Sequence, residues 1–171
     1  MDLIIAAIEL IFPAYCANAF PVIAGGGRPL DCGKNFVDGK PIFGKNKTFR
    51  GFFAGLLIGT GVGAAEALIL DYPMALPPAF RILFGFLVAI GALLGDLAGA
   101  FVKRRLGLAP GALLPVVDQV DFVVGAIVLS APLSFSFLSW QLILAVFVIT
   151  LPIHLLTNFA AYKLGLKSNP W

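Results

Sequence analysis

The chain has 171 residues, of which 60% are hydrophobic and 12% are charged, and its formal net charge is +3. A mean hydropathy of +0.98 excludes an ordinary soluble domain of this length and indicates a protein whose solvent is the bilayer. Because each crossing takes roughly 20 residues, we expect one transmembrane domain over residues 1–171 and no separate soluble domain.

Five apolar stretches are long enough to cross the bilayer. They cover residues 3–23, 51–70, 80–102, 122–137 and 142–164. Strand-like alternation is absent, and a spanning segment in lipid must satisfy its own backbone hydrogen bonds, so helices are the expected form. The predicted fold class is therefore all-α, a polytopic membrane protein built as a bundle of five transmembrane helices.

The Lys and Arg residues predict the orientation of this bundle. Of the twelve, only Arg81 lies in a segment on the far side of the predicted spans. The positive-inside rule therefore predicts a cytoplasmic loop of about residues 24–50, a second of about residues 103–117, an outside N-terminus and a cytoplasmic C-terminus. We expect a multi-pass protein of the plasma membrane whose active site faces the cytoplasm.

Some of these cations need no further role. Arg28, Lys163 and Lys167 are explained as well by membrane topology or by attraction to anionic lipid as by a binding site. Cys16 and Cys32 show neither metal-ligand spacing nor the density of a disulfide scaffold, so we interpret both as free thiols.

Four acidic residues, Glu66, Asp96, Asp118 and Asp121, lie in or at the edges of apolar spans. A carboxylate is costly there unless it meets a cation, a metal or water, so such residues are functional candidates. Asp118 and Asp121 are three residues apart, which puts both on one helical face. Two carboxylates repel, whereas Mg²⁺ would attract both, because hard oxygen ligands suit this ion. Stabilisation by the helix dipole is an alternative explanation for Asp118.

Asp96 lies in the third span, seven residues before Lys103, so both side chains lie on one face that runs toward the basic segment. Gly91, Gly95 and Gly99 recur at every fourth position of the same span. This small-residue spacing allows close approach of a neighbouring helix, and the fourth span is the natural neighbour. We therefore expect the three aspartates to converge.

The signals at Glu66 and His154 favour structural roles. Glu66 lies in the second span, far from the basic segments, and we expect a structural or interfacial role for it. His154 and Asn158 are four residues apart and share a helical face, which favours a hydrogen-bonded packing pair over catalysis.

The predicted loop of residues 24–50 combines glycines, cations and amide or hydroxyl donors just before a helix begins. Glycine lets the backbone approach a phosphate, and a helix N-terminus favours anions, so this composition indicates polyphosphate binding. A purely topogenic loop is the alternative, since no Walker A motif is present. The candidate donors nearest the helix are Lys45, Asn46, Thr48 and Arg50.

A second basic cluster, Lys103, Arg104 and Arg105, follows the third span. A nucleotide triphosphate and a lipid phosphate repel each other, so a reaction between them requires Mg²⁺ and several cations. In such a reaction a phosphate oxygen attacks the α-phosphorus in line while pyrophosphate leaves. This chemistry needs no serine, cysteine or histidine nucleophile, and the chain shows no catalytic triad.

Seven motifs occur in order along most of the chain: Asp38-Gly39-Lys40, residues 44–51, Gly95-Asp96-Leu97, residues 103–107, Pro110-Gly111, Leu114-Pro115 and Asp118-Gln119-Val120-Asp121. As a set they resemble the CDP-archaeol synthases, which are relatives of the CDP-diacylglycerol synthases. The latter carry a serine where this chain has Ala100, an arginine where it has Gln119, and a His-Gly-Gly motif that is missing here. These departures favour the archaeal branch.

The resemblance implies transfer of CMP from CTP to the ether-lipid phosphate 2,3-bis-O-geranylgeranylglycerol 1-phosphate, with Mg²⁺ required and no nucleic-acid partner. It implies that Asp96, Asp118 and Asp121 bind the metal and, with Lys103, are catalytic. It also implies that phosphate or cytidine contacts come from Lys45, Asn46, Thr48, Arg50, Lys103, Arg104 and Arg105.

Three alternatives remain open at this point. A CDP-diacylglycerol synthase and a CTP-dependent polyprenol kinase would share a membrane bundle and a metal site. A small channel or transporter belongs to a different class, because buried carboxylates also mark ion paths. Against that class, the chain has no internal repeat, and five spans do not divide into two equal inverted halves.

Overall fold

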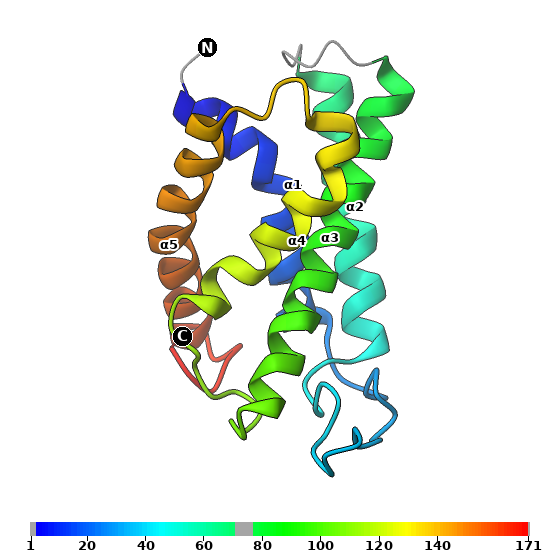
Figure 1. The fold of residues 1–171 in the computed structure, drawn as a ribbon, viewed down its shortest axis with the longest axis vertical. Helices are drawn as coiled ribbons and strands as arrows, with labels where there is room; N and C mark the ends of the chain where they lie inside the picture. Colours follow the sequence, from blue (N-terminus) through cyan, green and yellow to red (C-terminus); the bar gives the residue numbers. More distant parts are fainter. Residues whose placement is uncertain (1–2, 71–76, 171) are drawn as a thin grey trace.

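The computed structural model describes residues 3–70 and 77–170, and Figure 1 shows that these parts form a helical bundle. Its five helices are α1 (Leu3–Ala24), α2 (Phe49–Ile69), α3 (Pro78–Arg105), α4 (Val117–Ser134) and α5 (Trp140–Lys163). All five are long and apolar enough to cross a membrane, and the described residues contain no strand beyond isolated bridges. The predicted all-α fold with five spans is confirmed.

Of the helix ends that differ from the sequence prediction, two bear on the candidate site. α3 continues to Arg105, so Lys103, Arg104 and Arg105 form its last turn rather than part of a loop. α4 begins at Val117 instead of residue 122, so Asp118 and Asp121 lie inside the helix. The loops are thus residues 25–48 and 106–116. A span predicted from hydropathy ends at the first charged residues, although the backbone hydrogen bonds of the helix continue through them.

Glycines set the closest helix contact of the bundle, between α3 and α4. A Cβ placed on Gly91 would lie 2.8 Å from the Cα of Ala126, and one placed on Gly95 would collide with the carbonyl oxygen of Asp121. Only small residues permit backbones to approach this closely. The predicted approach of the third and fourth spans is therefore confirmed.

A second series of glycines, which the sequence analysis did not use, packs α2 against α1 and α3. Gly51, Gly55, Gly59 and Gly63 are all buried and are spaced four apart, so they form one face of α2. α5 is more peripheral and packs on α1 and α4, where the Tyr15 hydroxyl donates a hydrogen bond to Thr150 Oγ1 at 2.9 Å.

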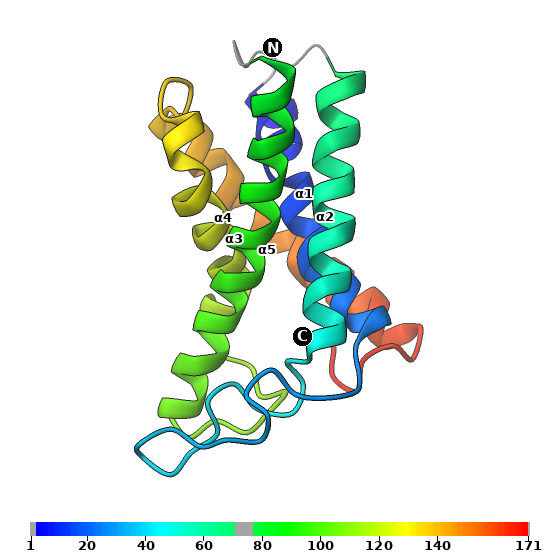
Figure 2. The same cartoon turned by 90° about the vertical axis from the view of Figure 1, so that its right-hand side faces the viewer.

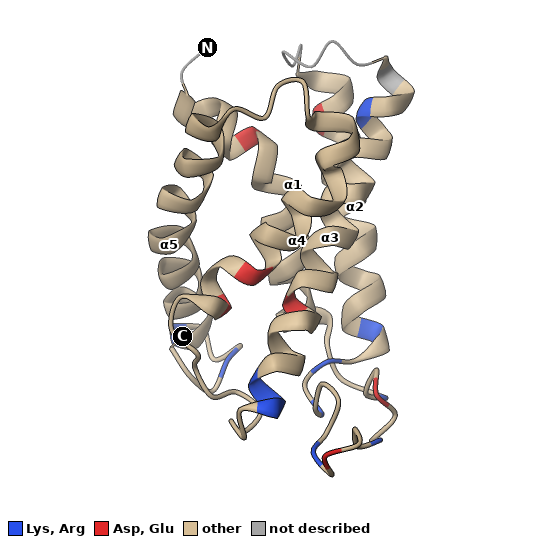
Figure 3. Ribbon diagram, viewed as in Figure 1, with Lys and Arg blue, Asp and Glu red and all other residues tan. Residues whose placement is uncertain are grey.

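The described chain is polar at one end. Figures 1 and 2 agree that loop 25–48, loop 106–116 and the segment after α5 lie together there, whereas the start of α1 lies at the opposite end. Figure 3 shows Lys and Arg gathered at this end, which we call the basic end. The predicted segregation of charge is present, and its assignment to the cytoplasm stays a prediction.

Candidate active site

A cavity of about 540 Å³ lies at the basic end, and all five helices contribute to its walls. Most of the candidate site residues line it, including all three aspartates. Arg50 and Arg105 do not. The candidates on its walls are Lys45, Asn46, Thr48, Asp96, Lys103, Arg104, Asp118 and Asp121.

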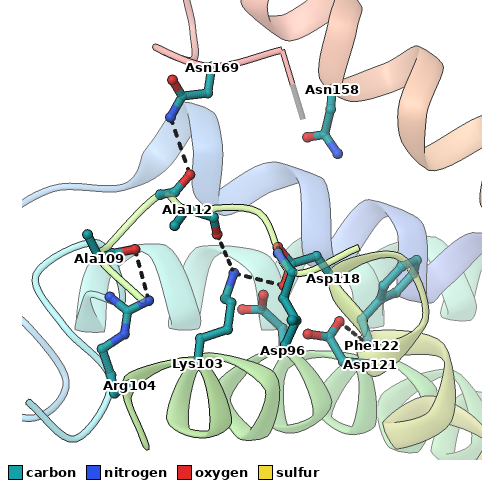
Figure 4. A network of polar contacts seen from close by, with 12 residues as sticks. Asp96, Lys103, Arg104, Ala109, Ala112, Asp118, Asp121, Phe122, Asn158 and Asn169 are labelled. Atoms are coloured by element: carbon teal, nitrogen blue, oxygen red, sulfur yellow. Dashed lines mark hydrogen bonds and ion pairs between the residues drawn. The ribbon is translucent and has the colours of Figure 1, made fainter. Parts of the chain in front are cut away.

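The three aspartates reach this cavity from two helices. Asp96 lies on α3, and Asp118 and Asp121 lie on the first turns of α4. Figure 4 shows their carboxylates turned toward a common space between these helices. A Cβ placed on Gly99 would collide with the Asp121 carboxylate, so Asp121 packs directly on the α3 backbone. The predicted convergence is confirmed, while metal binding stays a prediction.

Two of the carboxylates are neutralised by lysines. Lys47 Nζ lies 2.5 Å from Asp96 Oδ2, and Lys103 Nζ lies 2.8 Å from Asp118 Oδ1. Asp121 makes no ion pair with a described residue, and its Oδ1 accepts a hydrogen bond from the Phe122 amide at 2.6 Å. Each acid thus has a polar contact, and Lys47, which was not among the candidates, belongs to the site.

A tight turn positions Asp118. Val116 has a φ of +66° and a ψ of −50°, and the carbonyl oxygen of Pro115 accepts a hydrogen bond from the Val117 amide at 2.8 Å. This conformation is rare and strained for a β-branched residue, and such strain gathers at functional sites. The Leu114 amide donates to Asp118 Oδ2 at 3.0 Å, which holds the carboxylate at the end of the turn.

Asp31 anchors loop 25–48 beneath the cavity. Its buried carboxylate accepts hydrogen bonds from the amides of Gly33 at 3.0 Å, Phe43 at 3.0 Å and Gly44 at 2.8 Å. Burial by itself raises the pKa of Asp31, but these backbone donors outweigh it and lower the pKa below its ordinary value. The sequence analysis missed this role, although an Asp two residues before a Gly is typical of a side-chain-stabilised turn.

The end of this loop starts α2 and faces the cavity. Thr48 is the N-cap of α2, and its buried Oγ1 accepts a hydrogen bond from the Gly51 amide at 3.2 Å. Gly44 has a φ of +96°, and a Cβ there would lie 3.3 Å from the Pro110 ring. This position therefore requires glycine. The arrangement brings a helix N-terminus, which favours anions, to the cavity wall.

Arg104 is the most buried cation of the site, with 4% of its surface exposed. Its Nη2 donates to the carbonyl oxygen of Ala109 at 3.2 Å. Its Nε and Nη1 are buried and have no hydrogen-bond partner among the described residues. A buried guanidinium with open donors suits a phosphate, which accepts two parallel hydrogen bonds from it.

Arg105 and Arg50 lie outside the cavity. Arg105 Nε lies 3.2 Å from Asp38 Oδ2, and the guanidinium packs on the Phe36 and Phe101 rings at 4.9 Å and 4.7 Å from their centroids. Arg105 therefore ties loop 25–48 to α3. Arg50 is exposed on the first turn of α2. Neither placement favours the predicted contact with CTP.

The wall opposite α3 comes from α5 and the segment after it, residues 164–170. Asn158 Nδ2 lies 3.0 Å from His154 Nδ1, so the predicted pair is confirmed. Both residues line the cavity, however, together with Lys167, whose Nζ donates to Asn158 Oδ1 at 2.7 Å. Burial lowers the pKa of Lys167, and the nearby Lys47 ammonium lowers it further. Sequence periodicity did not indicate which face of α5 meets the cavity.

These observations define a class: a polytopic membrane protein with five spans and, at one end, a polar cavity in which acids and cations face each other. A family model described as CarS-like: CDP-archaeol synthase matches residues 1–171. The chain belongs to the CDP-archaeol synthase family.

Individual relatives agree along the whole length. The chain is 44% identical over 171 residues to a CDP-archaeol synthase of Pyrococcus furiosus, with 100% of both chains covered. It is 38% identical over 178 residues to one of Methanocaldococcus jannaschii, with 99% of this chain and 98% of that relative covered. The resemblance inferred from the motifs is confirmed, and the chain is a membrane-embedded nucleotidyltransferase.

A solved structure shares the fold. It is described as an intramembrane enzyme for archaeal membrane lipids biosynthesis, and it aligns with a TM-score of 0.80 at 37% sequence identity. The alignment covers 91% of this chain and 94% of that chain. The agreement extends over nearly all of the chain.

Proposed function

We propose that the protein transfers CMP from CTP to 2,3-bis-O-geranylgeranylglycerol 1-phosphate, giving CDP-archaeol and pyrophosphate. The observation that carries this proposal is the cavity of about 540 Å³, a volume typical of small-ligand sites. Its cations offset the repulsion between two phosphorylated substrates, and its acids suit a metal that would neutralise phosphate charge. The cations on its walls are Lys45, Lys47, Lys103, Arg104 and Lys167.

Mg²⁺ is the cofactor that we propose, and the donor set fits it. Asp96, Asp118 and Asp121 supply hard oxygen ligands. Among residues 3–70 and 77–170, no group of three or more Asp, Glu, His or Cys residues is placed so that it could hold a metal ion. The proposal therefore rests on fewer carboxylates at a time, since Mg²⁺ is usually held by one or two carboxylates together with water and substrate phosphates. When bound, the ion would neutralise phosphate charge and polarise the reacting phosphoryl group.

The basic residues have two roles in the proposed reaction. Before substrate binds, Lys47 and Lys103 neutralise Asp96 and Asp118 and so keep these half-buried carboxylates from repelling one another. When the triphosphate enters, the same ammonium groups exchange a carboxylate for phosphate oxygens within the same cavity. The Nε and Nη1 groups of Arg104 have no hydrogen-bond partner among the described residues. They can donate to a phosphate without breaking an existing side-chain contact.

The proposed step needs no covalent intermediate with the protein. An oxygen of the lipid phosphate attacks the α-phosphorus of CTP and forms a new phosphoanhydride bond. The bond between the α-phosphorus and the bridging oxygen breaks, and its electron pair leaves with pyrophosphate. The protein contributes by holding two phosphates in line and by excluding water from the cavity.

We infer that the basic end faces the cytoplasm, where it would meet CTP, and that the membrane is the plasma membrane. The excess of Lys and Arg at this end supports the orientation. Cys32 lies exposed in loop 25–48, whereas Cys16 lies within α1. A membrane-impermeant thiol reagent should therefore label Cys32 in inside-out vesicles and spare it in intact cells, with Cys32→Ser as the control. Labelling in intact cells would reverse the orientation.

A product assay tests the function. Purified protein with CTP, Mg²⁺ and the geranylgeranyl ether-lipid phosphate should form a CDP-lipid and equimolar pyrophosphate, identified by mass. A polyprenol kinase would instead release CDP, and a diacyl-specific synthase would prefer the ester-linked lipid phosphate. Ion flux without CTP consumption would indicate a transporter. Any of these outcomes would overturn the proposal.

A further inference from the structure

We propose that Lys167 binds a phosphate group of one of the two substrates, and that Asn158 holds it in position for this purpose. The inference rests on the proposed function, since it adds a residue to the same site. It makes the segment of residues 164–170 part of the active site.

The path of the chain after α5 places Lys167 at the cavity. Gly165 has a φ of +72°, its amide donates to the carbonyl oxygen of Tyr162 at 3.0 Å, and the Leu166 amide donates to that of Ala161 at 2.9 Å. This pair of hydrogen bonds is a Schellman motif, which ends a helix and turns the chain back. Asn169 Nδ2 then donates to the carbonyl oxygen of Gly111 at 3.3 Å. The segment is thus tied to loop 106–116 and closes over the cavity wall.

One contact of the Lys167 side chain connects it to the core of the bundle. Its Nζ donates to Asn158 Oδ1 at 2.7 Å, and Asn158 in turn contacts the His154 ring. His154 stacks on Phe122, with ring centroids 5.9 Å apart and an interplanar angle of 28°. Phe122 is fully buried in the core, so the chain of contacts fixes Asn158 firmly. A long lysine side chain that is held in this way loses less freedom when it binds a phosphate.

The charges that line the cavity are consistent with a phosphate-binding role for Lys167. The walls carry five cations and three carboxylates, and Lys47 and Lys103 already pair with Asp96 and Asp118. A triphosphate together with a lipid phosphate brings several negative charges, which the remaining wall must offset. Lys167 lies close enough to interact electrostatically with Lys47, Lys103, Asp96 and Asp118. It therefore extends the basic wall to the α5 side of the same space.

Lys163 provides a matched control in the same part of the chain. It lies in the last turn of α5, is exposed, and places its Nζ over the Phe159 ring at 5.5 Å from the centroid. It does not line the cavity. Lys163→Gln removes one positive charge from the basic end, as Lys167→Gln does. It removes no contact in the site.

The experiment measures kcat and KM for each substrate, together with CTP binding by calorimetry in the absence of lipid, for Lys167→Gln, Lys167→Arg, Lys163→Gln and Asn158→Ala. Lys167→Gln should raise one KM by roughly 10- to 100-fold, the loss expected for a charged hydrogen bond. A rise for CTP with weaker CTP binding identifies the nucleotide, and a rise for the lipid phosphate alone identifies the lipid. Lys167→Arg should restore most of the affinity, Asn158→Ala should shift the same KM by less, and Lys163→Gln should match the wild type.

The proposal is overturned if both KM values and CTP binding are unchanged in Lys167→Gln, or if Lys163→Gln has the same effect. It is also overturned if Lys167→Gln lowers the thermal stability and kcat without changing either KM, because the role would then be structural. An inactive wild type with intact CTP binding would overturn the proposed reaction instead. Calorimetry of Lys167→Gln with CTP and with the lipid phosphate would still test the lysine in that case: unchanged binding of both would overturn its role.

Discussion

The two ends of the bundle both contain carboxylates within apolar helices, but their surroundings differ. At the basic end, Asp96 and Asp118 pair with lysines that come from other segments and border a cavity of about 540 Å³. At the opposite end, Glu9 and Glu66 border a cavity of about 20 Å³, enough for about one water molecule. An acid in a membrane helix is thus a weak indicator of catalysis. Arg81 also borders the smaller cavity, so it is the combination of several cations with a substrate-sized volume that separates the two ends.

The largest expected effect comes from the acids of the basic end. Asp118→Asn and Asp121→Asn should each lower CTP turnover by at least about 100-fold, because each removes a charge from the proposed metal site. The change preserves the shape of the side chain, so the helix should still insert. Product formation and thermal stability in detergent check the two claims, and wild-type turnover by both variants would refute the assignment.

The next largest effect is expected from substitutions at the close contact between α3 and α4. Gly99→Ala would push a methyl group against the Asp121 carboxylate and should cost about 1–3 kcal/mol of stability as well as most of the activity. Gly63→Ala would press on Gly85 away from the cavity, so we expect lost stability but active folded protein. Thermal melts, combined with activity measured per folded molecule, distinguish the two variants.

Gly61 supplies the control for this pair, because a Cβ there would meet no atom within 4 Å. Gly61→Ala should leave activity unchanged and should not lower the stability, since alanine is the better helix former. If Gly99→Ala behaved in the same way as Gly61→Ala, the contact between Asp121 and the α3 backbone would not matter.

A smaller, pH-dependent effect is expected in loop 25–48. The backbone donors lower the pKa of Asp31, so this carboxylate stabilises the loop above its unfolded pKa of about 4, and the stabilisation is lost as the pH falls through the lowered value. Proteolysis of the loop should therefore accelerate in acid. Asp31→Asn should give faster cleavage already at neutral pH, with a loss of about 1.5–3 kcal/mol for hydrogen bonds to a charged group.

The more exposed Asp38 is the comparison for this prediction. Asp38→Asn loses the ion pair with Arg105 but keeps the buried anchor of the loop, so its cleavage should accelerate less than that of Asp31→Asn. Equal cleavage of both variants, or a wild-type rate that does not change with acid, would show that Asp31 does not anchor the loop.

Glu66→Gln is expected to have the smallest effect. The residue lies at the end of the bundle away from the cavity, so kcat/KM should stay within roughly twofold of the wild type, as for distant, independent sites. A large loss of turnover in a well-folded Glu66→Gln variant would remove the contrast between the two ends, because the far carboxylate would then take part in the reaction.

The site could be predicted from sequence where local rules apply. The spacing of Asp118 and Asp121 and the glycines around Asp96 are helical patterns, and they correctly indicated the contact between α3 and α4. Lys167, Asn158 and Asp31 could not be assigned in this way. Their roles depend on which face of α5 meets the cavity and on how a loop closes around one carboxylate, and both are decided by contacts between distant segments.

Hydropathy and helical period act over short distances, so they are enough to predict five membrane crossings, basic residues concentrated at one end and three acids that converge. The pairing of each acid with its cation and the contact of Arg105 with a loop could be seen only in the folded protein. The same is true of the closure of the site by the segment after α5. These outcomes depend on packing between segments that are far apart in the chain, where no local period constrains them.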